Sequence, residues 1–101
     1  MRPGNIVELK MHTVICQGIE QDTHDYVCEL LSYDAMEETL ILILREDALT
    51  DLSLDAIYEC KIKGIDEQLL CMGRIRQRYC GTEGKIVQLQ IVNGFYKNSI
   101  K

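Results

Sequence analysis

The chain has 101 residues, of which 47% are hydrophobic and 27% are charged, and it carries a formal net charge of −5. This length and composition predict one folded domain over residues 1–101 and exclude a disordered chain. The negative charge argues against non-specific nucleic-acid binding, because that binding needs a basic surface.

Hydrophobic segments long enough to span a membrane are not evident in the sequence. The longest unbroken apolar run is Leu40–Leu44, whereas a membrane span needs roughly 20 residues. The first residues, Met1–Gly4, are not followed by the apolar stretch of a secretory signal. We therefore expect a cytoplasmic protein with no membrane partner.

The five cysteines are Cys16, Cys28, Cys60, Cys71 and Cys80. Their number is odd and no two are spaced as C-x-x-C, which favours reduced thiols packed in the core and no cofactor. A His-x-x-x-Cys spacing occurs at His12 with Cys16 and at His24 with Cys28, and these ligand types would suit zinc. Because residues four apart on a strand lie about 13 Å apart, we do not expect a metal site.

Alternation of polar and apolar residues predicts strands in the first half of the chain. Pro3–Gly4 is a turn signal, and a strand is expected directly after it, over residues 6–15. The polar segment Gln17–Asp25 predicts a loop. Further strands are expected at Tyr26–Tyr33 and Thr39–Arg45, joined by the acidic turn Asp34–Glu38.

Leu40–Leu44 differs from the other predicted strands because it is apolar on both faces. In a closed barrel one face of a strand points inward, and an apolar outer face needs a cover. That cover could be a partner molecule, including a second copy of the chain in a homodimer, or the chain's own loops. The sequence leaves these possibilities open.

The second half of the chain predicts three more strands, at Ala56–Lys63, Leu69–Tyr79 and Lys85–Val92, with a tight turn at Gly81–Gly84. The segments Glu46–Leu54 and Asn93–Lys101 could each hold a short helical turn. Strands at regular spacing with short turns and little helix are typical of a small antiparallel barrel or sandwich. We predict an all-β fold, a small antiparallel six-stranded β-barrel with at most short helical turns.

Arg74, Arg76 and Arg78 occupy alternate positions of a predicted strand and should share one outer face, with Ile75 and Tyr79 pointing inward. Pairing of the last two strands sets Arg74 near Gln90 and Arg76 near Gln88. The predicted partner-binding residues are Arg74, Arg76, Arg78, Glu59, Gln88 and Gln90. This face could bind an acidic protein segment or a phosphate, or it could be a solvated surface with weak cross-strand pairs.

The segment Asp51-Leu52-Ser53-Leu54-Asp55-Ala56 leads into the fourth predicted strand, and Gly94–Phe95 follows the sixth. With the strand rhythm between Thr50 and Tyr96, these residues resemble a PilZ-type barrel. In that family an [Asp/Asn]-x-Ser-x-x-Gly motif leads into a strand, and the body ends near a Gly-Phe pair. The opening Pro3-Gly4-x-Ile6-x-Glu8-x-Lys10 is similar to the related amino-terminal barrel of flagellar-brake proteins.

The resemblance implies a ligand, because PilZ barrels bind cyclic di-GMP through the Ser motif and an upstream Arg-x-x-x-Arg. Asp51 and Ser53 are thus candidate ligand-binding residues, although these residue types also commonly hold turns through backbone N–H groups. The chain departs from the family pattern at two points. Only Arg2 and Arg45 precede Asp51, without the family spacing, and Ala56 replaces the motif glycine. The arginines that bind the phosphate groups would have to come from another part of this chain or from another chain.

No nucleophile paired with a base and no glycine-rich phosphate loop is evident in the sequence. We therefore predict a non-enzymatic binding or regulatory module of bacterial signalling that acts through a protein partner. One alternative is a cyclic di-GMP receptor with a displaced site, which combines Asp51 and Ser53 with the arginines. Another is a homodimeric structural domain that pairs through Leu40–Leu44.

Overall fold

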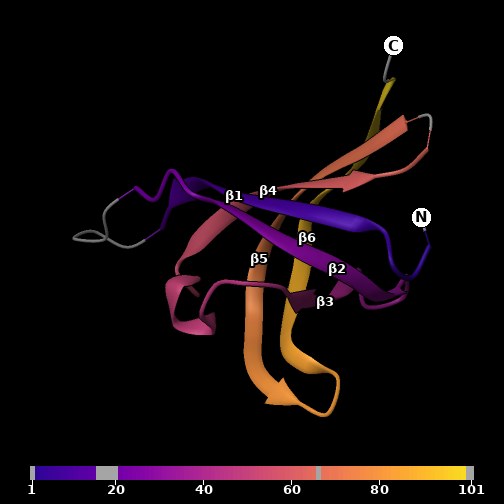
Figure 1. Ribbon diagram of the computed structural model, residues 1–101. Coiled ribbons are helices and arrows are strands. Elements are labelled where there is room, and N and C mark those ends of the chain that lie inside the picture. Colours follow the sequence, from indigo (N-terminus) through magenta and orange to yellow (C-terminus); the bar gives the residue numbers. More distant parts are fainter. Residues whose placement is uncertain (1, 16–20, 66, 100–101) are drawn as a thin grey trace.

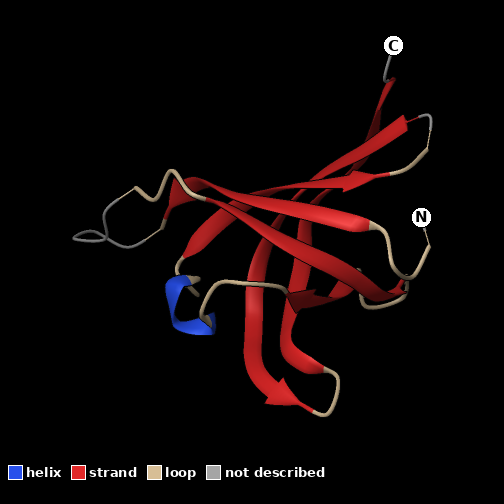
Figure 2. Ribbon diagram, viewed as in Figure 1, coloured by secondary structure: helices blue, strands red, loops and turns tan. Residues whose placement is uncertain are grey.

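The computed structural model describes residues 2–15, 21–65 and 67–99, with side chains described up to residue 94. These residues form six strands: β1 (Ile6–Val14), β2 (Asp25–Asp34), β3 (Thr39–Leu44), β4 (Ala56–Lys63), β5 (Glu67–Gly81) and β6 (Gly84–Ser99). A 3₁₀ turn, η1 (Leu49–Asp51), lies between β3 and β4 (Figure 2), within the segment where a helical turn was expected. In these described ranges no helix has the length and apolarity needed to cross a membrane.

The strands pair antiparallel into a closed barrel in the order β1-β2-β3-β6-β5-β4 (Figure 1). Pairing of β1 with β4 closes the sheet, for example at Leu9 opposite Cys60. The predicted all-β, six-stranded antiparallel barrel is therefore confirmed. Figure 1 also shows that the hairpin of β5 and β6 projects beyond the other strands, which places its turn outside the barrel.

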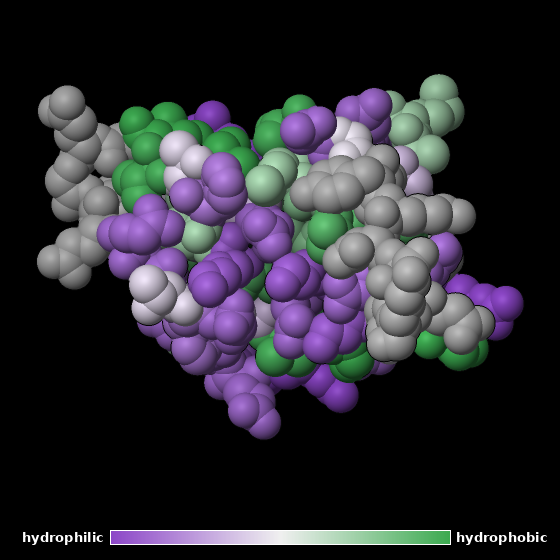
Figure 3. Space-filling model, turned by 90° about the horizontal axis from the view of Figure 1, so that it is seen from above, coloured by the Kyte–Doolittle hydropathy of each residue, from purple (hydrophilic) through white to green (hydrophobic). Residues whose placement is uncertain are grey.

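Alternate residues of the strands fill the barrel interior, because successive side chains of a strand point to opposite faces. On β3, Leu40, Leu42 and Leu44 are at most 1% exposed. Their neighbours in the core include Val7, Leu9, Tyr26, Cys28, Tyr58, Cys60, Cys71, Val87 and Leu89. Three thiols are buried as predicted, but Cys80, next to the last residue of β5, is exposed. On the face shown in Figure 3, hydrophilic residues occupy the centre and hydrophobic residues gather toward the margins.

The apolar outer face of β3 is covered in part by the neighbouring strands. Ile41 and Ile43 on this face are half-buried. Ile43 lies opposite Glu29 of β2 and Ile86 of β6, and Ile86 is itself only 2% exposed. The barrel's own side chains therefore account for this partial cover, and a homodimer through Leu40–Leu44 stays a prediction.

The last two strands extend beyond their predicted limits, whereas the first four match them to within one residue. β5 runs from Glu67 to Gly81, and β6 continues past Val92 to Ser99. The prediction of a helical turn after Val92 is therefore wrong for residues 93–99. This segment pairs with the start of β5, and Ser99 lies opposite Glu67. The tight turn between β5 and β6 is confirmed, and Gly84 has a φ of 129°, a value that favours glycine.

Candidate binding face

An open groove lies on the outer surface of β5 and β6, beside the loop that leads into β4. Its volume is about 460 Å³. Its lining residues are Arg74, Arg76, Gln90, Asp55, Leu54, Val92 and Ile75, the last of which belongs to the core and is only 2% exposed. Arg74, Arg76 and Gln90 were predicted from the sequence as partner-binding residues, and the fold brings these three together.

The guanidinium groups of Arg74 and Arg76 lie along this groove, and both residues are exposed. Arg74 lies opposite Gln90, as the predicted register required. Arg74 Nε–H donates to the Leu54 carbonyl oxygen at 3.3 Å, and Arg76 Nη1 donates to Gln90 Oε1 at 3.1 Å. Each contact uses one of the five N–H donors of a guanidinium group. The remaining donors can face a ligand.

A β-bulge interrupts the arginine stripe. The register of β5 against β6 shifts between Ile75 and Gln77. Gln77 therefore lies opposite Gln88, where Arg76 was expected. Because an added residue inverts the alternation of side chains, Tyr79 also leaves the interior and is 42% exposed, contrary to the prediction.

Arg78 turns toward the segment that contains η1. It lies opposite the core residue Val87 and is half-buried. Its Nη1 donates to the carbonyl oxygen of Leu49 at 2.8 Å and also to that of Leu52. These bonds attach β5 to both ends of the 3₁₀ turn, which begins at Leu49 and is followed by Leu52. The prediction that Arg78 shares the outer face with the other two arginines is therefore wrong.

Glu59 and Gln88 lie outside the lining of the groove. Glu59 is on β4, between Lys10 of β1 and Met72 of β5. Its Oε1 lies 3.8 Å from Lys61 Nζ, a pair that is partly exposed and contributes little to stability. Gln88 is half-buried on β6. These two predicted residues therefore do not line the groove that contains Arg74 and Arg76.

The motif residues Asp51 and Ser53 hold the turn before β4. Ser53 Oγ accepts the Asp55 N–H at 3.0 Å, and the Ser53 N–H donates to the buried Tyr58 hydroxyl at 2.9 Å. Asp51 Oδ2 accepts the Ala48 N–H at 3.4 Å. These are the turn-forming contacts typical of such residues, and ligand binding by Asp51 and Ser53 stays a prediction.

No known protein-family model, curated protein or solved structure matches this chain. The resemblance to PilZ barrels, which rests on the Asp51 and Ser53 motif and on strand rhythm, therefore also stays a prediction.

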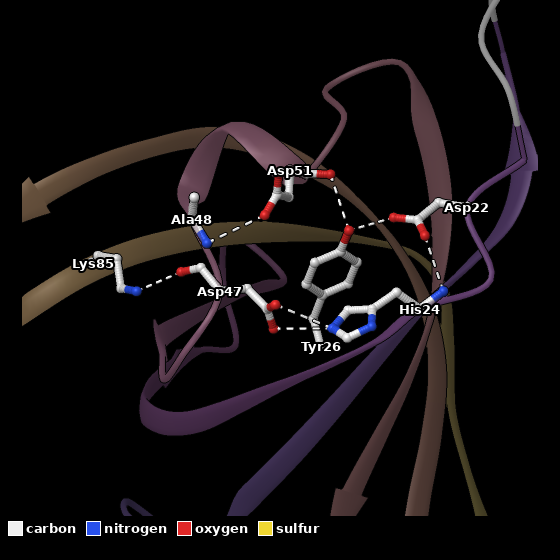
Figure 4. Close-up of polar contacts among 7 residues, drawn as sticks. All are labelled: Asp22, His24, Tyr26, Asp47, Ala48, Asp51 and Lys85. Atoms are coloured by element: carbon white, nitrogen blue, oxygen red, sulfur yellow. Dashed lines mark hydrogen bonds and ion pairs between the residues drawn. The ribbon is translucent and has the colours of Figure 1, made fainter.

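A polar cluster that was not predicted lies where the loop before β2 meets the loop after β3 (Figure 4). The Tyr26 hydroxyl donates to the Asp22 carboxylate and lies 3.2 Å from the Asp51 carbonyl oxygen. His24 Nε2 lies 3.1 Å from Asp47 Oδ1. Asp22, His24 and Tyr26 occupy alternate positions of one segment, and this spacing was the one sign in the sequence that their side chains could lie together. Their partners Asp47 and Asp51 are 23 and 25 residues away, so the sequence did not reveal them.

Burial and hydrogen bonding shift the pKa values in this cluster. Burial raises the pKa of Tyr26 well above its usual 10.0, and the bond to the Asp22 carboxylate adds to this effect. Burial also opposes ionisation of Asp22, but the bonds from the Tyr26 hydroxyl and the His24 N–H outweigh it and hold the pKa of Asp22 below its usual 3.8. Near neutral pH, Tyr26 is therefore a hydrogen-bond donor to an ionised carboxylate.

Alkaline pH is expected to destabilise the protein through Tyr26. Because its folded-state pKa is raised, the stabilisation is complete below pH 10.0 and is lost as the pH rises toward the folded-state value. The Tyr26→Phe variant has no such proton. Midpoints of thermal unfolding, measured from about pH 8 to about pH 11, should therefore fall less steeply for this variant than for the unchanged chain. Equal slopes would contradict the assignment, since the raised pKa of buried Tyr58 affects both proteins alike.

The described residues of the two His-x-x-x-Cys pairs are not arranged as a metal site. Cys28 is 0% exposed in the core, whereas His12 and His24 are exposed. Cys16 lies outside the described residues. In the part of the chain that the structure describes, no group of three or more His, Cys, Asp or Glu side chains could hold a metal ion.

Proposed function

We propose that the chain is a non-enzymatic binding module whose groove over β5 and β6 takes an acidic, extended segment of a partner protein. The observation that carries the proposal is the pair of exposed arginines, Arg74 and Arg76, in a groove that Leu54 and Val92 also line. Guanidinium groups bind carboxylates through paired N–H donors. The aliphatic side chains suit the apolar residues that alternate with acidic ones in an extended segment.

The net charge of −5 bears on how such a partner would be recognised. It opposes long-range attraction of an acidic segment, and the Asp55 carboxylate in the groove adds local repulsion. Binding must therefore rest on direct contacts with the two guanidinium groups. From the resemblance to PilZ barrels, we place the module in bacterial cytoplasmic signalling, as a degenerate PilZ-like regulator.

A direct test measures fluorescence anisotropy of a labelled peptide in which glutamate alternates with leucine. Reversing both charges, Arg74→Glu with Arg76→Glu, is expected to weaken binding at least about tenfold, or ~1.4 kcal/mol. The matched control, Lys61→Glu with Lys63→Glu, makes the same change of charge on β4, outside the groove lining. It should bind the peptide almost as the unchanged chain does. Equal weakening by both variants, or no binding to the unchanged chain, would overturn the proposal.

One observation favours a second candidate, a cyclic di-GMP receptor with a displaced site. Arg74 Nε donates to the Leu54 carbonyl oxygen, so this arginine lies against the turn that contains Ser53. Titration calorimetry with cyclic di-GMP separates the two candidates. Heat of binding that is lost in both Ser53→Ala and Arg74→Glu would support the receptor, and no heat at high micromolar nucleotide would remove it.

A further inference from the structure

Two buried thiols face each other across the β4–β5 hairpin. Cys60 of β4 and Cys71 of β5 are register partners, and both are 0% exposed in the barrel core. Their side chains therefore face each other across the strand pair inside the barrel. Directly opposite residues of antiparallel strands have Cα atoms about 4.5–5.5 Å apart, within the roughly 4.4–6.8 Å found in disulfides.

The other described cysteines lack this arrangement. Cys28 is also buried, but its register partners are Val7 and Leu44. Cys80 is exposed and lies opposite Lys85. Within the described ranges, a thiol directly opposite another thiol therefore occurs at one place, the Cys60–Cys71 pair.

We propose that Cys60 and Cys71 are a reversible oxidation site, which closes to an intramolecular disulfide when a hydroperoxide enters the barrel. Cys71 gives up its proton, and its thiolate attacks the peroxide. The O–O bond breaks, Cys71 becomes a sulfenic acid, and the departing oxygen takes up one proton and leaves as an alcohol or water. The Cys60 thiol then attacks that sulfur. The S–O bond breaks, the S–S bond forms, and the sulfenic hydroxyl leaves as water with the Cys60 proton. The two thiols together lose two electrons and the hydroperoxide gains them.

The pKa values of the two opposed thiols shift in opposite directions, which distinguishes their roles. The bond from the Cys60 S–H lowers the pKa of Cys71 despite its burial, because the bond stabilises the thiolate. Donating that bond, together with burial, raises the pKa of Cys60. The thiolate is the nucleophile in such chemistry, so Cys71 reacts first and Cys60 resolves the sulfenic acid.

The disulfide would link two neighbouring strands without moving either out of the barrel. The closed ring contains the turn between β4 and β5, and a covalent link of this kind restricts the unfolded chain. We therefore expect the oxidised protein to unfold at a temperature several degrees higher than the reduced protein. Dithiothreitol should restore the lower value.

The test treats the full, reduced chain with tert-butyl hydroperoxide under native conditions and then alkylates it in denaturant. The expected product carries two fewer alkyl groups, and peptide mapping links Cys60 to Cys71. Cys80→Ser should form the bond as the unchanged chain does, and Cys71→Ala should not. Full alkylation of both residues after treatment, oxidation confined to Cys80, or a different linkage would overturn the proposal. The mapping uses the unchanged chain, so the test holds even if Cys71→Ala does not fold.

Discussion

Replacing Leu42 with alanine is expected to lower the free energy of unfolding by about 2–5 kcal/mol. Leu42 is 0% exposed and points into the barrel from the centre of β3. It lies opposite Leu30 of β2 and Val87 of β6, which are both core residues. Truncation removes buried apolar surface and leaves a cavity. The cavity persists because β3 is paired with a strand on each side and cannot move inward to fill it. Urea denaturation followed by circular dichroism measures the loss.

The matched control is Ile41→Ala, one residue earlier on the same strand. Ile41 is half-buried on the outer face, so its truncation should cost about 1 kcal/mol and leave no enclosed cavity. An equal loss from both variants would contradict this reading. If that loss also depended on protein concentration, it would indicate that a second copy covers Leu40–Leu44, and native mass spectrometry would detect the dimer.

Gly73→Ala is expected to destabilise the protein by about 1–3 kcal/mol, because the core has no room for a side chain at this position. A Cβ atom on Gly73 would lie 2.6 Å from Leu89 Cγ and 3.0 Å from the Gln90 carbonyl oxygen. The Leu89 side chain is buried, and the Gln90 oxygen belongs to the backbone of β6, so neither can move away freely. Thermal unfolding and urea denaturation both measure the effect.

Gly94→Ala is the control for this second variant. Gly94 lies on β6, and a Cβ atom there would meet nothing within 4 Å. Its replacement should therefore leave stability almost unchanged. If Gly73→Ala were as stable as the unchanged protein, β5 and β6 would be able to separate at this point, which would contradict the prediction. Shortening the contacting side chain by adding Leu89→Val would then give no gain in stability.

Much of the fold follows from local pattern. The alternation along residues 6–15 and 56–63 predicted both strands, because a strand with one buried face needs apolar side chains at every second position. The pairing of Arg74 with Gln90 was also predicted correctly, because a tight turn between two alternating segments sets their register. The end of β6 did not follow, because Asn93–Ser99 becomes a strand through its pairing with the start of β5.

The candidate site was predicted only in part, and the arginines show why. Alternation placed all three on one face, but closure of the barrel requires β5 to bend, and the bulge after Ile75 turns Arg78 toward Leu49 and Leu52. A bulge depends on the path of the partner strand, which no local pattern of β5 contains.

The sequence by itself determined the six strands and the outer-face positions of Arg74 and Arg76, because these depend on the two-residue period of a strand. Only the tertiary structure decided which residues far apart in the chain meet. It set Tyr26 beside Asp51 and Cys60 against Cys71, and it joined Leu54 to Arg74 at the edge of the groove. The physical reason is that register, bulges and loop paths are chosen by the packing of the whole barrel.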